Sequence, residues 1–235
     1  MRLKPSELGT LDLKILSRAL AEFRYAASVF QPYRSVRKVS IFGSARTPES
    51  DPHYKLAVEF ASKLASSGFM VITGAASGIM KAGNVGAGAE KSFGANILLL
   101  FEQGANEVIV DDPKLITFRY FFTRKLFFLI EAHAVALFPG GFGTHDEGLE
   151  TLTLLQTGET PPRPLVLVEP PGKNYWEAWN GFVRTQLLER GLISPVDLGF
   201  YRIVHSAKEG VDWITRFYST YHSMRRVRDQ LVLRL

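Results

Sequence analysis

The chain has 235 residues, of which 46% are hydrophobic and 12% aromatic, so it can bury the core of one globular domain and does not have the composition of a disordered chain. It contains no cysteine, which excludes disulfides and thiolate metal sites. Its five histidines lack the spacing of metal ligands, and we therefore expect no metal.

The formal net charge is +5, with an isoelectric point of about 9.4, and the basic excess lies at the two ends of the chain. Two interpretations remain open: solvated or interface-forming terminal segments, or an arm that binds nucleic acid. Because no basic run is interleaved with aromatic residues, we favour the first interpretation and expect no nucleic-acid partner. The basic residues in question are Arg2, Lys4, Lys14, Arg18, Arg24, Arg34, Arg37 and Lys38, and then Arg225, Arg226, Arg228 and Arg234.

Neither a secretory signal nor a membrane span is expected. Charges run through Arg2–Lys14, which leaves no continuous apolar core for a signal peptide. The longest apolar run, Leu126–Phe138, is interrupted by Glu131 and His133 and is too short to cross a bilayer. These features predict a soluble cytoplasmic protein without membrane contacts.

Along the chain, short apolar runs alternate with amphipathic segments. We predict an N-terminal helical extension (1–36), a Rossmann-like nucleotide-binding domain (37–221) and a basic C-terminal tail (222–235). The predicted strands are Val39–Phe42, Phe69–Thr73, Ile97–Phe101, Ala134–Phe138, Leu165–Val168 and Ile203–Val204, with a possible extended piece at Val108–Val110 in an otherwise loop-like segment, Glu102–Thr117. The predicted helices are Leu11–Phe30, Pro52–Ser67, a small-residue helix to about Lys91, Tyr120–His133, Asp146–Gln156, Tyr175–Arg190 and Ala207–Tyr221.

Alternation of continuous apolar strands with helices is typical of a parallel sheet that is covered on both faces. The predicted fold class is therefore α/β, a Rossmann-like doubly wound parallel sheet with an N-terminal helical extension. In such sheets ligands bind at the carboxyl ends of the strands.

Three predicted strands end in small-residue turns: Gly43-Ser44, Gly74–Gly78 and Gly140–Thr144. A single glycine turn is often only a tight connection, but three at equivalent strand ends favour a ligand cleft. The third turn continues into a helix, and the partial positive charge of a helix N-terminus favours a phosphate.

Two common nucleotide-binding patterns do not fit. The dinucleotide pattern needs three spaced glycines after the first strand, and Gly43-Ser44-Ala45-Arg46 does not supply them. The nearest Walker candidate, Ala89-Glu90-Lys91-Ser92, has glutamate where glycine is required. A hydride-transfer enzyme and an ordinary P-loop NTPase are therefore disfavoured.

The stretch from Pro139 to Glu147, Pro-Gly-Gly-Phe-Gly-Thr-His-Asp-Glu, resembles the P-G-G-x-G-T-x-x-E motif of the LOG (Lonely Guy) phosphoribohydrolases at every fixed position. The pair Arg124-Lys125 matches a second element of that family. The resemblance covers roughly residues 39 to 213. It implies hydrolysis of the N-glycosidic bond of nucleoside 5′-monophosphates, including N6-modified adenosine monophosphates of the cytokinin type, by a homodimer or larger homo-oligomer with its cleft at the interface and without a cofactor.

Three positions depart from the family pattern. Relatives usually have more glycine in the second turn than Gly74-Ala75-Ala76-Ser77-Gly78. Lys81 stands where relatives often carry an acid, and His145 stands where an apolar residue is common.

The predicted roles follow from the chemistry of glycosidic cleavage, which develops positive charge on the ribose. A carboxylate beside the ribose stabilises that charge or takes a proton from water, and we assign this role to Glu147 rather than read it only as a favourable helix N-terminal acid. Arg124 is the second predicted catalytic residue, because its planar fork suits a phosphate or a leaving base. We expect Thr144 to cap the helix and contact phosphate, and His145 to be a supporting or a surface residue rather than the base. The predicted substrate-binding residues are Gly43, Ser44, Gly74, Gly78, Lys125, Pro139, Gly140, Gly141, Gly143, Thr144 and Asp146.

Two alternatives to the hydrolase are a carrier protein and a decarboxylase. A non-catalytic carrier of a nucleotide or phosphorylated cofactor would use the same cleft, and the altered second turn is its best support. Proteins similar to this one are also labelled lysine decarboxylases, but no lysine in the sequence is singled out for a pyridoxal phosphate Schiff base.

Overall fold

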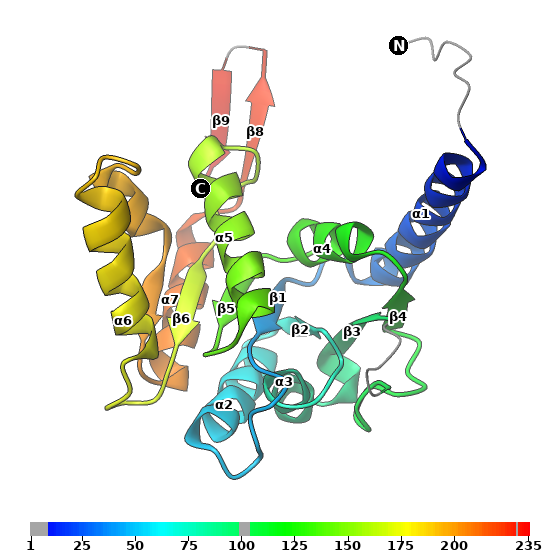
Figure 1. Cartoon of the computed structure of the whole chain (residues 1–235), viewed down its shortest axis with the longest axis horizontal. Helices are drawn as coiled ribbons and strands as arrows, with labels where there is room; N and C mark the ends of the chain where they lie inside the picture. Colours follow the sequence, from blue (N-terminus) through cyan, green and yellow to red (C-terminus); the bar gives the residue numbers. More distant parts are fainter. Residues whose placement is uncertain (1–8, 99–103, 229) are drawn as a thin grey trace.

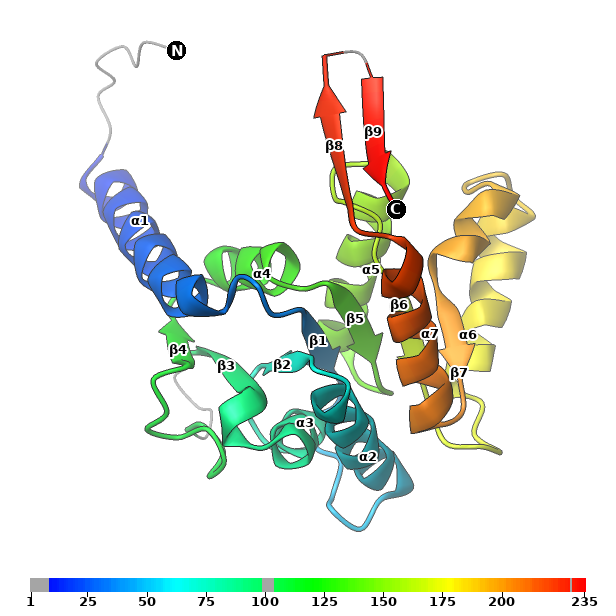
Figure 2. The same cartoon turned by 180° about the vertical axis from the view of Figure 1, so that it is seen from behind.

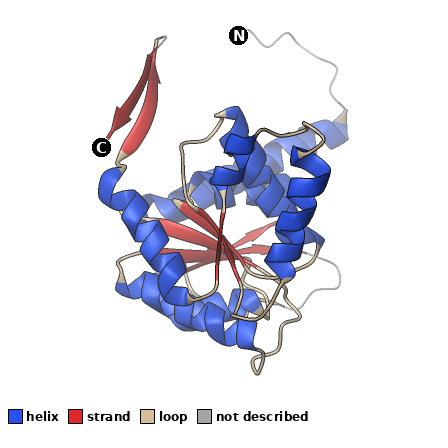
Figure 3. Cartoon of the chain, turned by 90° about the vertical axis from the view of Figure 1, so that its left-hand side faces the viewer, coloured by secondary structure: helices blue, strands red, loops and turns tan. Residues whose placement is uncertain are grey.

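The computed structural model describes residues 9–98, 104–228 and 230–235. Its centre is a seven-stranded sheet with helices on both faces (Figures 1 and 3). Every neighbouring pair of strands in this sheet is parallel, and the strand order is β4-β3-β2-β1-β5-β6-β7. The predicted Rossmann-like α/β class is confirmed.

The strands are β1 (Lys38–Phe42), β2 (Met70–Thr73), β3 (Ser92–Ile97), β4 (Leu115–Phe118), β5 (Ala134–Leu137), β6 (Leu165–Val168) and β7 (Arg202–Val204). The helices are α1 (Thr10–Phe30), α2 (Pro52–Ser66), α3 (Ile79–Ala87), α4 (Phe121–Ile130), α5 (Phe142–Thr157), α6 (Tyr175–Phe182) and α7 (Ala207–Thr220).

The two faces of the sheet have separate cores, because successive side chains of a strand point to opposite sides. On one face, Val39 and Ile41 of β1 pack in a cluster with α2, α3 and α7. On the other, Phe42 belongs to a cluster that includes Phe30 of α1, Phe128 of α4 and Trp176 of α6. Both sides of the strands are thus buried, which explains their continuous apolar sequences.

The strand order places a topological switch point between β1 and β5. From β1 the chain winds outward to β4, and then it crosses back to β5 and winds outward to β7. The connections that leave β1 and β5 therefore diverge at the carboxyl ends of these two strands, which is where ligands bind in folds of this kind.

Helix α1 is anchored at its C-terminal half and projects at its N-terminal half (Figures 1 and 2). Glu22 accepts hydrogen bonds from the backbone N–H of Arg119 (2.8 Å) and from Thr123 Oγ1 (2.6 Å). Phe30 is buried and stacks on Phe93, with ring centroids 4.4 Å apart. The predicted helical extension is present, and its last turns are part of the core.

The residues predicted as a basic tail form an antiparallel hairpin of β8 (Ser223–Val227) and β9 (Gln230–Arg234). Figures 1 and 2 show it extending from the end of α7 beyond the central sheet.

Several element boundaries differ from the prediction. The third strand is Ser92–Ile97 and contains Gly94, whereas residues 99–101 of the predicted strand lie outside the described residues. Strand β4 was not predicted, and the proposed extended piece Val108–Val110 forms turns. Helix α5 begins at Phe142, four residues before its predicted start, and the last predicted turns of α6 form a π-helix, Val183–Leu188.

Candidate active site

The three turns that follow β1, β2 and β5 contact one another directly. The backbone N–H of Ser44, after β1, donates to the carbonyl of Pro139, after β5 (3.1 Å). The carbonyl of Ser44 accepts from the N–H of Ile79 (3.0 Å), and Ser77 Oγ donates to the carbonyl of Ala45 (2.8 Å). The three turns form one continuous surface at the switch point.

Three glycines in these turns are required by packing within the chain, and a fourth, Gly74, lies against the flexible side chains of Met80 and Arg124. A β-carbon on Gly43 would lie 2.7 Å from the side chain of Ile79, and one on Gly78 would collide with the carbonyl of Ser44. Gly78 also has a φ of +62°, which side chains disfavour. A β-carbon on Gly140 would lie 3.0 Å from the N of Ser44, and one on Gly74 would lie 2.5 Å from Met80 Sδ. These glycines allow the turns to touch.

Gly141 and Gly143 are different. A β-carbon at either position would meet no described atom within 4 Å, and neither residue has a positive φ. Contacts and backbone conformation within the described chain therefore do not require glycine there. The open space over them is what the approach of a ligand to the backbone would need.

The start of helix α5 presents its free N–H groups to this space. Gly141 is the N-cap and makes no side-chain cap, so Thr144 lies inside the first turn, and the prediction that it caps the helix is wrong. Thr144 is buried, and its hydroxyl lies against Gly140. The N-terminus of α5 is suited to an anion because it combines unpaired N–H groups with the positive end of the helix dipole.

Glu147 lies one turn further along α5 and is 8% exposed. Burial raises the pKa of its carboxyl to about 7, and the neighbouring positive charges of Lys125 and Arg124 only partly offset this effect. Its Oε2 is buried without a hydrogen-bond partner among the described residues. A carboxyl with a pKa near neutrality can take up or release a proton at physiological pH.

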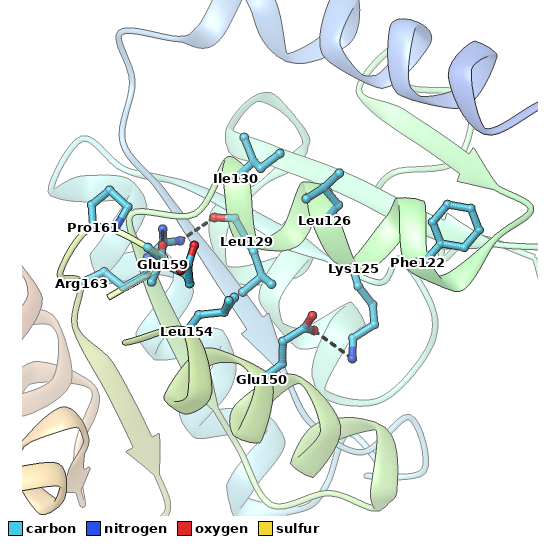
Figure 4. A pocket seen from close by; sticks show the side chains of 11 residues that line it. Phe122, Lys125, Leu126, Leu129, Ile130, Glu150, Leu154, Glu159, Pro161 and Arg163 are labelled. Carbon is cyan, nitrogen blue, oxygen red and sulfur yellow. Dashed lines mark hydrogen bonds and ion pairs between the residues drawn. The ribbon is translucent and has the colours of Figure 1, made fainter. Parts of the chain in front are cut away.

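Lys125 joins α4 to α5 beside Glu147. Its Nζ lies 2.9 Å from Asp146 Oδ1 and 2.9 Å from Glu150 Oε2. Burial lowers the pKa of Lys125, but the hydrogen bonds to Asp146 and Glu150 more than compensate, so this pKa is raised. Figure 4 shows Lys125 and Glu150 facing each other across the space between the two helices.

Arg124, adjacent to Lys125, points toward the second turn. Its Nη2 would lie 3.1 Å from a β-carbon on Gly74, and its guanidinium lies 5.3 Å from the ring centroid of Phe128. The structure therefore brings Gly43, Ser44, Gly74, Gly78, Arg124 and the Pro139–Gly140 turn together, with Lys125, Asp146 and Glu147 beside the start of α5.

Sequence reasoning missed a brace behind the third turn. Tyr175, the first residue of α6, donates its hydroxyl to the carbonyl of Gly140, and His145 Nε2 lies 2.7 Å from the same hydroxyl. The carboxylate of Glu169, which is fully buried, accepts from the backbone N–H of Tyr175 (2.9 Å). His145 thus supports the glycine cradle, by which we mean Gly140, Gly141 and Gly143, and this is one of the two roles expected for it. Burial lowers the pKa of His145. In the sequence, the only sign of this brace is that His145 stands where the family commonly has an apolar residue.

A second unpredicted group holds the turn after β2. Asn106 Nδ2 donates to the carbonyls of Ala75 (2.9 Å) and Ala76 (3.1 Å) and to Asn84 Oδ1 (3.0 Å). Thr73 Oγ1 also donates to Asn84 Oδ1 (2.8 Å). Ala75, which is buried, has a φ of +63° within this network. Asn106 lies in a segment predicted only as a loop, and no sequence pattern indicated its role.

A pyridoxal phosphate Schiff base needs a lysine with a lowered pKa. Neither Lys125 nor Lys38 fits this requirement at the site. Lys125 has a raised pKa. The pKa of Lys38 is lowered by burial, but Lys38 is the first residue of the central strand β1 and lies at its amino end, away from the turn that follows this strand. There its Nζ donates to the carbonyls of Tyr33 and Val36. Among the described residues, no group of three His, Cys, Asp or Glu side chains could hold a metal ion.

In the described part of the chain, no helix is both long and apolar enough to cross a membrane.

Comparisons with known proteins identify a family and a shared fold. A family model described as "Possible lysine decarboxylase" matches residues 63–214, which include all of the site except the first turn. A search of curated proteins found no significant match.

Three solved structures are similar in fold. The molybdenum cofactor carrier protein from Chlamydomonas reinhardtii is 16% identical, with a TM-score of 0.55, over 79% of this chain and 99% of that chain. The molybdenum cofactor binding protein from Rippkaea orientalis is 15% identical, with a TM-score of 0.54, over 78% and 96%. DNA processing protein A from Helicobacter pylori is 16% identical, with a TM-score of 0.51, over 77% and 81%. At these identities the likeness extends to the fold alone.

Proposed function

The chain belongs to the LOG, or "possible lysine decarboxylase", family, and from this premise we propose that it is a nucleoside 5′-monophosphate phosphoribohydrolase. It would release a free base, adenine or an N6-modified adenine, and ribose 5-phosphate. The observation that carries this proposal is Glu147, a buried carboxyl with a pKa of about 7 one helical turn from an open glycine cradle.

In the proposed complex, the phosphate binds at the start of α5 over Gly141 and Gly143. This placement is supported by the free N–H groups of the helix and by the space over the two glycines. Ser44 and the Gly74–Gly78 turn form the adjoining wall. The substrate ribose then lies within reach of the second turn of α5, where Glu147 and Asp146 are found.

In the proposed reaction, a water oxygen forms a bond to C1′ while the bond from C1′ to the base nitrogen breaks. The electron pair of the broken bond stays on the base, which is then protonated. Glu147 accepts the proton of the attacking water, and its ionised form stabilises the positive charge on the ribose. Arg124 stabilises the charge on the leaving base or on the phosphate.

The altered second turn does not argue against this function on packing grounds. The carbonyls of Ala75 and Ala76 accept hydrogen bonds from Asn106 Nδ2. The turn is thus fixed by a buried network even though it has fewer glycines than expected of the family.

We also propose that the protein acts as a homo-oligomer. Support comes from the exposed apolar side chains on α1 and α4, which include Leu16, Leu20, Phe122 and Ile130. Exposed apolar stripes of this kind are typical of interaction surfaces.

The test is chromatography of the protein after incubation with a panel of nucleoside 5′-monophosphates, including AMP and an isopentenyl-adenosine monophosphate. We expect equal amounts of free base and ribose 5-phosphate from at least one of them. If calorimetry instead shows tight binding and the monophosphate is recovered intact, the protein is a carrier, and the hydrolase proposal is wrong.

A further inference from the structure

The N-terminal half of α1 exposes an apolar seam with the spacing of a helix that packs on another helix. Leu13, Leu16, Leu20 and Phe23 follow a 3-4-3 pattern, as in the a and d positions of a coiled coil. All four are exposed, although α1 is anchored to the domain through Glu22, Ala26 and Phe30. Lys14 and Arg18 lie on the opposite side of the helix.

A second apolar stripe runs along α4, next to the point where α1 is attached. Phe122, Leu126 and Ile130 recur at every fourth residue and are between 39% and 56% exposed. The attachment is close, because the rings of Phe23 and Phe127 lie 5.1 Å apart between centroids.

Between α4 and α5 lies a groove of about 700 Å³. Figure 4 shows Leu129 and Leu154 in its floor, with Leu126 and Ile130 along one side. Its polar end carries Lys125 and Glu150, whose ion pair adjoins Glu147.

The exposed apolar area of the seam and the stripe is comparable with one side of a protein interface. The seven side chains of the seam and the stripe together expose roughly 700 Å², if about 200 Å² is taken for each fully exposed side chain. The largest apolar patch on a typical monomer is about 300–600 Å², and each side of a standard protein interface buries about 800 Å². The patch therefore matches one side of an interface.

We propose that the seam of α1 from one copy of the chain packs into the α4–α5 groove of a second copy, and that the second copy returns the same contact. In both views α4 lies between the projecting α1 and α5 (Figures 1 and 2). A two-fold axis over α4 therefore carries the α1 of each copy onto the α5 side of the other, and the contact closes as a dimer. The spacing of the seam is that of a helix that packs on other helices, and the α4–α5 groove is lined by two helices.

This docking places α1 over the Lys125–Glu150 pair and so closes one side of the candidate active site with an element of the partner. Because α1 lies outside the residues matched by the family model, this contact is a property of the extension. The inference rests on the homo-oligomer proposed above but not on the hydrolysis.

The first test is the mass of the protein by light scattering. The wild type should have twice the 26.3 kDa chain mass, and the double substitution L16E and L20E should halve it to one chain. These residues lie on the projecting half of α1, so circular dichroism should confirm an intact fold. L192E is the matched control: Leu192 is similarly exposed but lies outside the seam, the stripe and the groove, and the mass of this variant should not change.

The second test distinguishes the groove from a simple pairing of two α1 helices. Because the chain has no cysteine, single cysteines can be introduced without background. A Leu16→Cys chain is mixed with a size-tagged Leu154→Cys chain and treated with a short thiol cross-linker. We expect mixed cross-linked pairs to predominate. Cross-links only between two Leu16→Cys chains would overturn the proposal, as would a monomeric wild type or an unchanged mass in the L16E and L20E variant.

These outcomes are separate from those of the functional test. A monomer that releases free base would overturn the docking alone, whereas a cross-linked dimer that leaves every monophosphate intact would overturn the hydrolase alone.

Discussion

The second and third turns of the site carry similar glycine-rich sequences but are built in opposite ways. In the turn after β2, Gly74 and Gly78 are filled by contacts with Met80 and Ser44, and Asn106 binds the intervening carbonyls. In the turn after β5, Gly140 is packed against Thr144 and Ser44, but Gly141 and Gly143 face open space. A glycine is needed for packing where a neighbouring atom occupies the position that its β-carbon would take. A glycine with open space at that position is the better indication of a ligand site.

The largest expected effect is on the rate of base release, and it follows substitution of Glu147, the acid beside the turn that contains Gly141 and Gly143. Substitution of Glu147 by Gln should lower the rate of base release by about 10²–10⁴-fold, because it removes the proton acceptor and the negative charge. It should not destabilise the fold. Burial raises the pKa of the Glu147 carboxyl from 4.5 to about 7 in the folded state. Between these two pH values the carboxyl is ionised in the unfolded chain but protonated in the folded chain. The free energy of unfolding therefore falls as pH rises from 4.5 through 7.

The E147Q variant should therefore be more stable than the wild type at pH 8 by about 1–3 kcal/mol, and no more stable at pH 4. Thermal unfolding at the two pH values measures this difference. Wild-type turnover by E147Q would show that the acid of the open turn has no catalytic role.

The second prediction contrasts the two kinds of glycine. G141A combined with G143A should raise KM for the monophosphate by about 10–100-fold through lost or misplaced charge-assisted hydrogen bonds. Its unfolding free energy should stay close to that of the wild type. G78A should instead lose about 2–4 kcal/mol of stability, because of the positive φ of Gly78 and the collision with Ser44.

Urea unfolding and steady-state kinetics of both variants make this comparison. If G141A with G143A were as destabilised as G78A, the distinction between open and packed glycines would fail.

The third prediction concerns pH. If ionised Glu147 is the active form, kcat/KM should rise with pH through a midpoint near 7. Lys125 lowers the pKa of Glu147, so removal of its charge by K125M should move the midpoint to higher pH. K81M is a control, because Lys81 pairs with Glu49 and Glu107 and does not affect the pKa of Glu147. A midpoint that moves lower in K125M would contradict the assignment.

The smallest effect is expected at the brace. Y175F removes the hydroxyl that binds the carbonyl of Gly140, and it should raise KM by about fivefold, with little change in kcat, for a loss of about 1 kcal/mol. Y201F is the matched control, because its hydroxyl binds Asn180 Oδ1 (2.7 Å) away from the cradle. Equal kinetic effects of Y175F and Y201F would show that the brace does not position the third turn.

The sequence predicted the fold class well because buried parallel strands are continuous apolar runs, and Leu165–Val168 even has the observed bounds. Strand β4 escaped because Leu115–Phe118 includes an exposed position and follows a long polar segment. The third strand was predicted to start only at Ile97, whereas β3 begins at Ser92 and contains Gly94, which lies against Leu115 and Ala75.

The candidate site was predictable where contiguous residues carry it, as in Pro139–Glu147 and the pair Arg124-Lys125. Contacts between distant residues could not be read from one sequence. Asn106 reaches the turn of Ala75, and Tyr175 reaches Gly140, only because the sheet brings these loops together. The early start of α5 was also missed, since Gly143 in its first turn disfavours a helix by propensity alone.

The measurement that tests the central claim most directly is base release from AMP, or from the best monophosphate of the panel, by the wild type and E147Q side by side at pH 8. We predict free base and ribose 5-phosphate in equal amounts from the wild type, and release slower by at least about 10²-fold from a fully folded E147Q. Intact monophosphate with the wild type, or equal release by both proteins, would contradict the account.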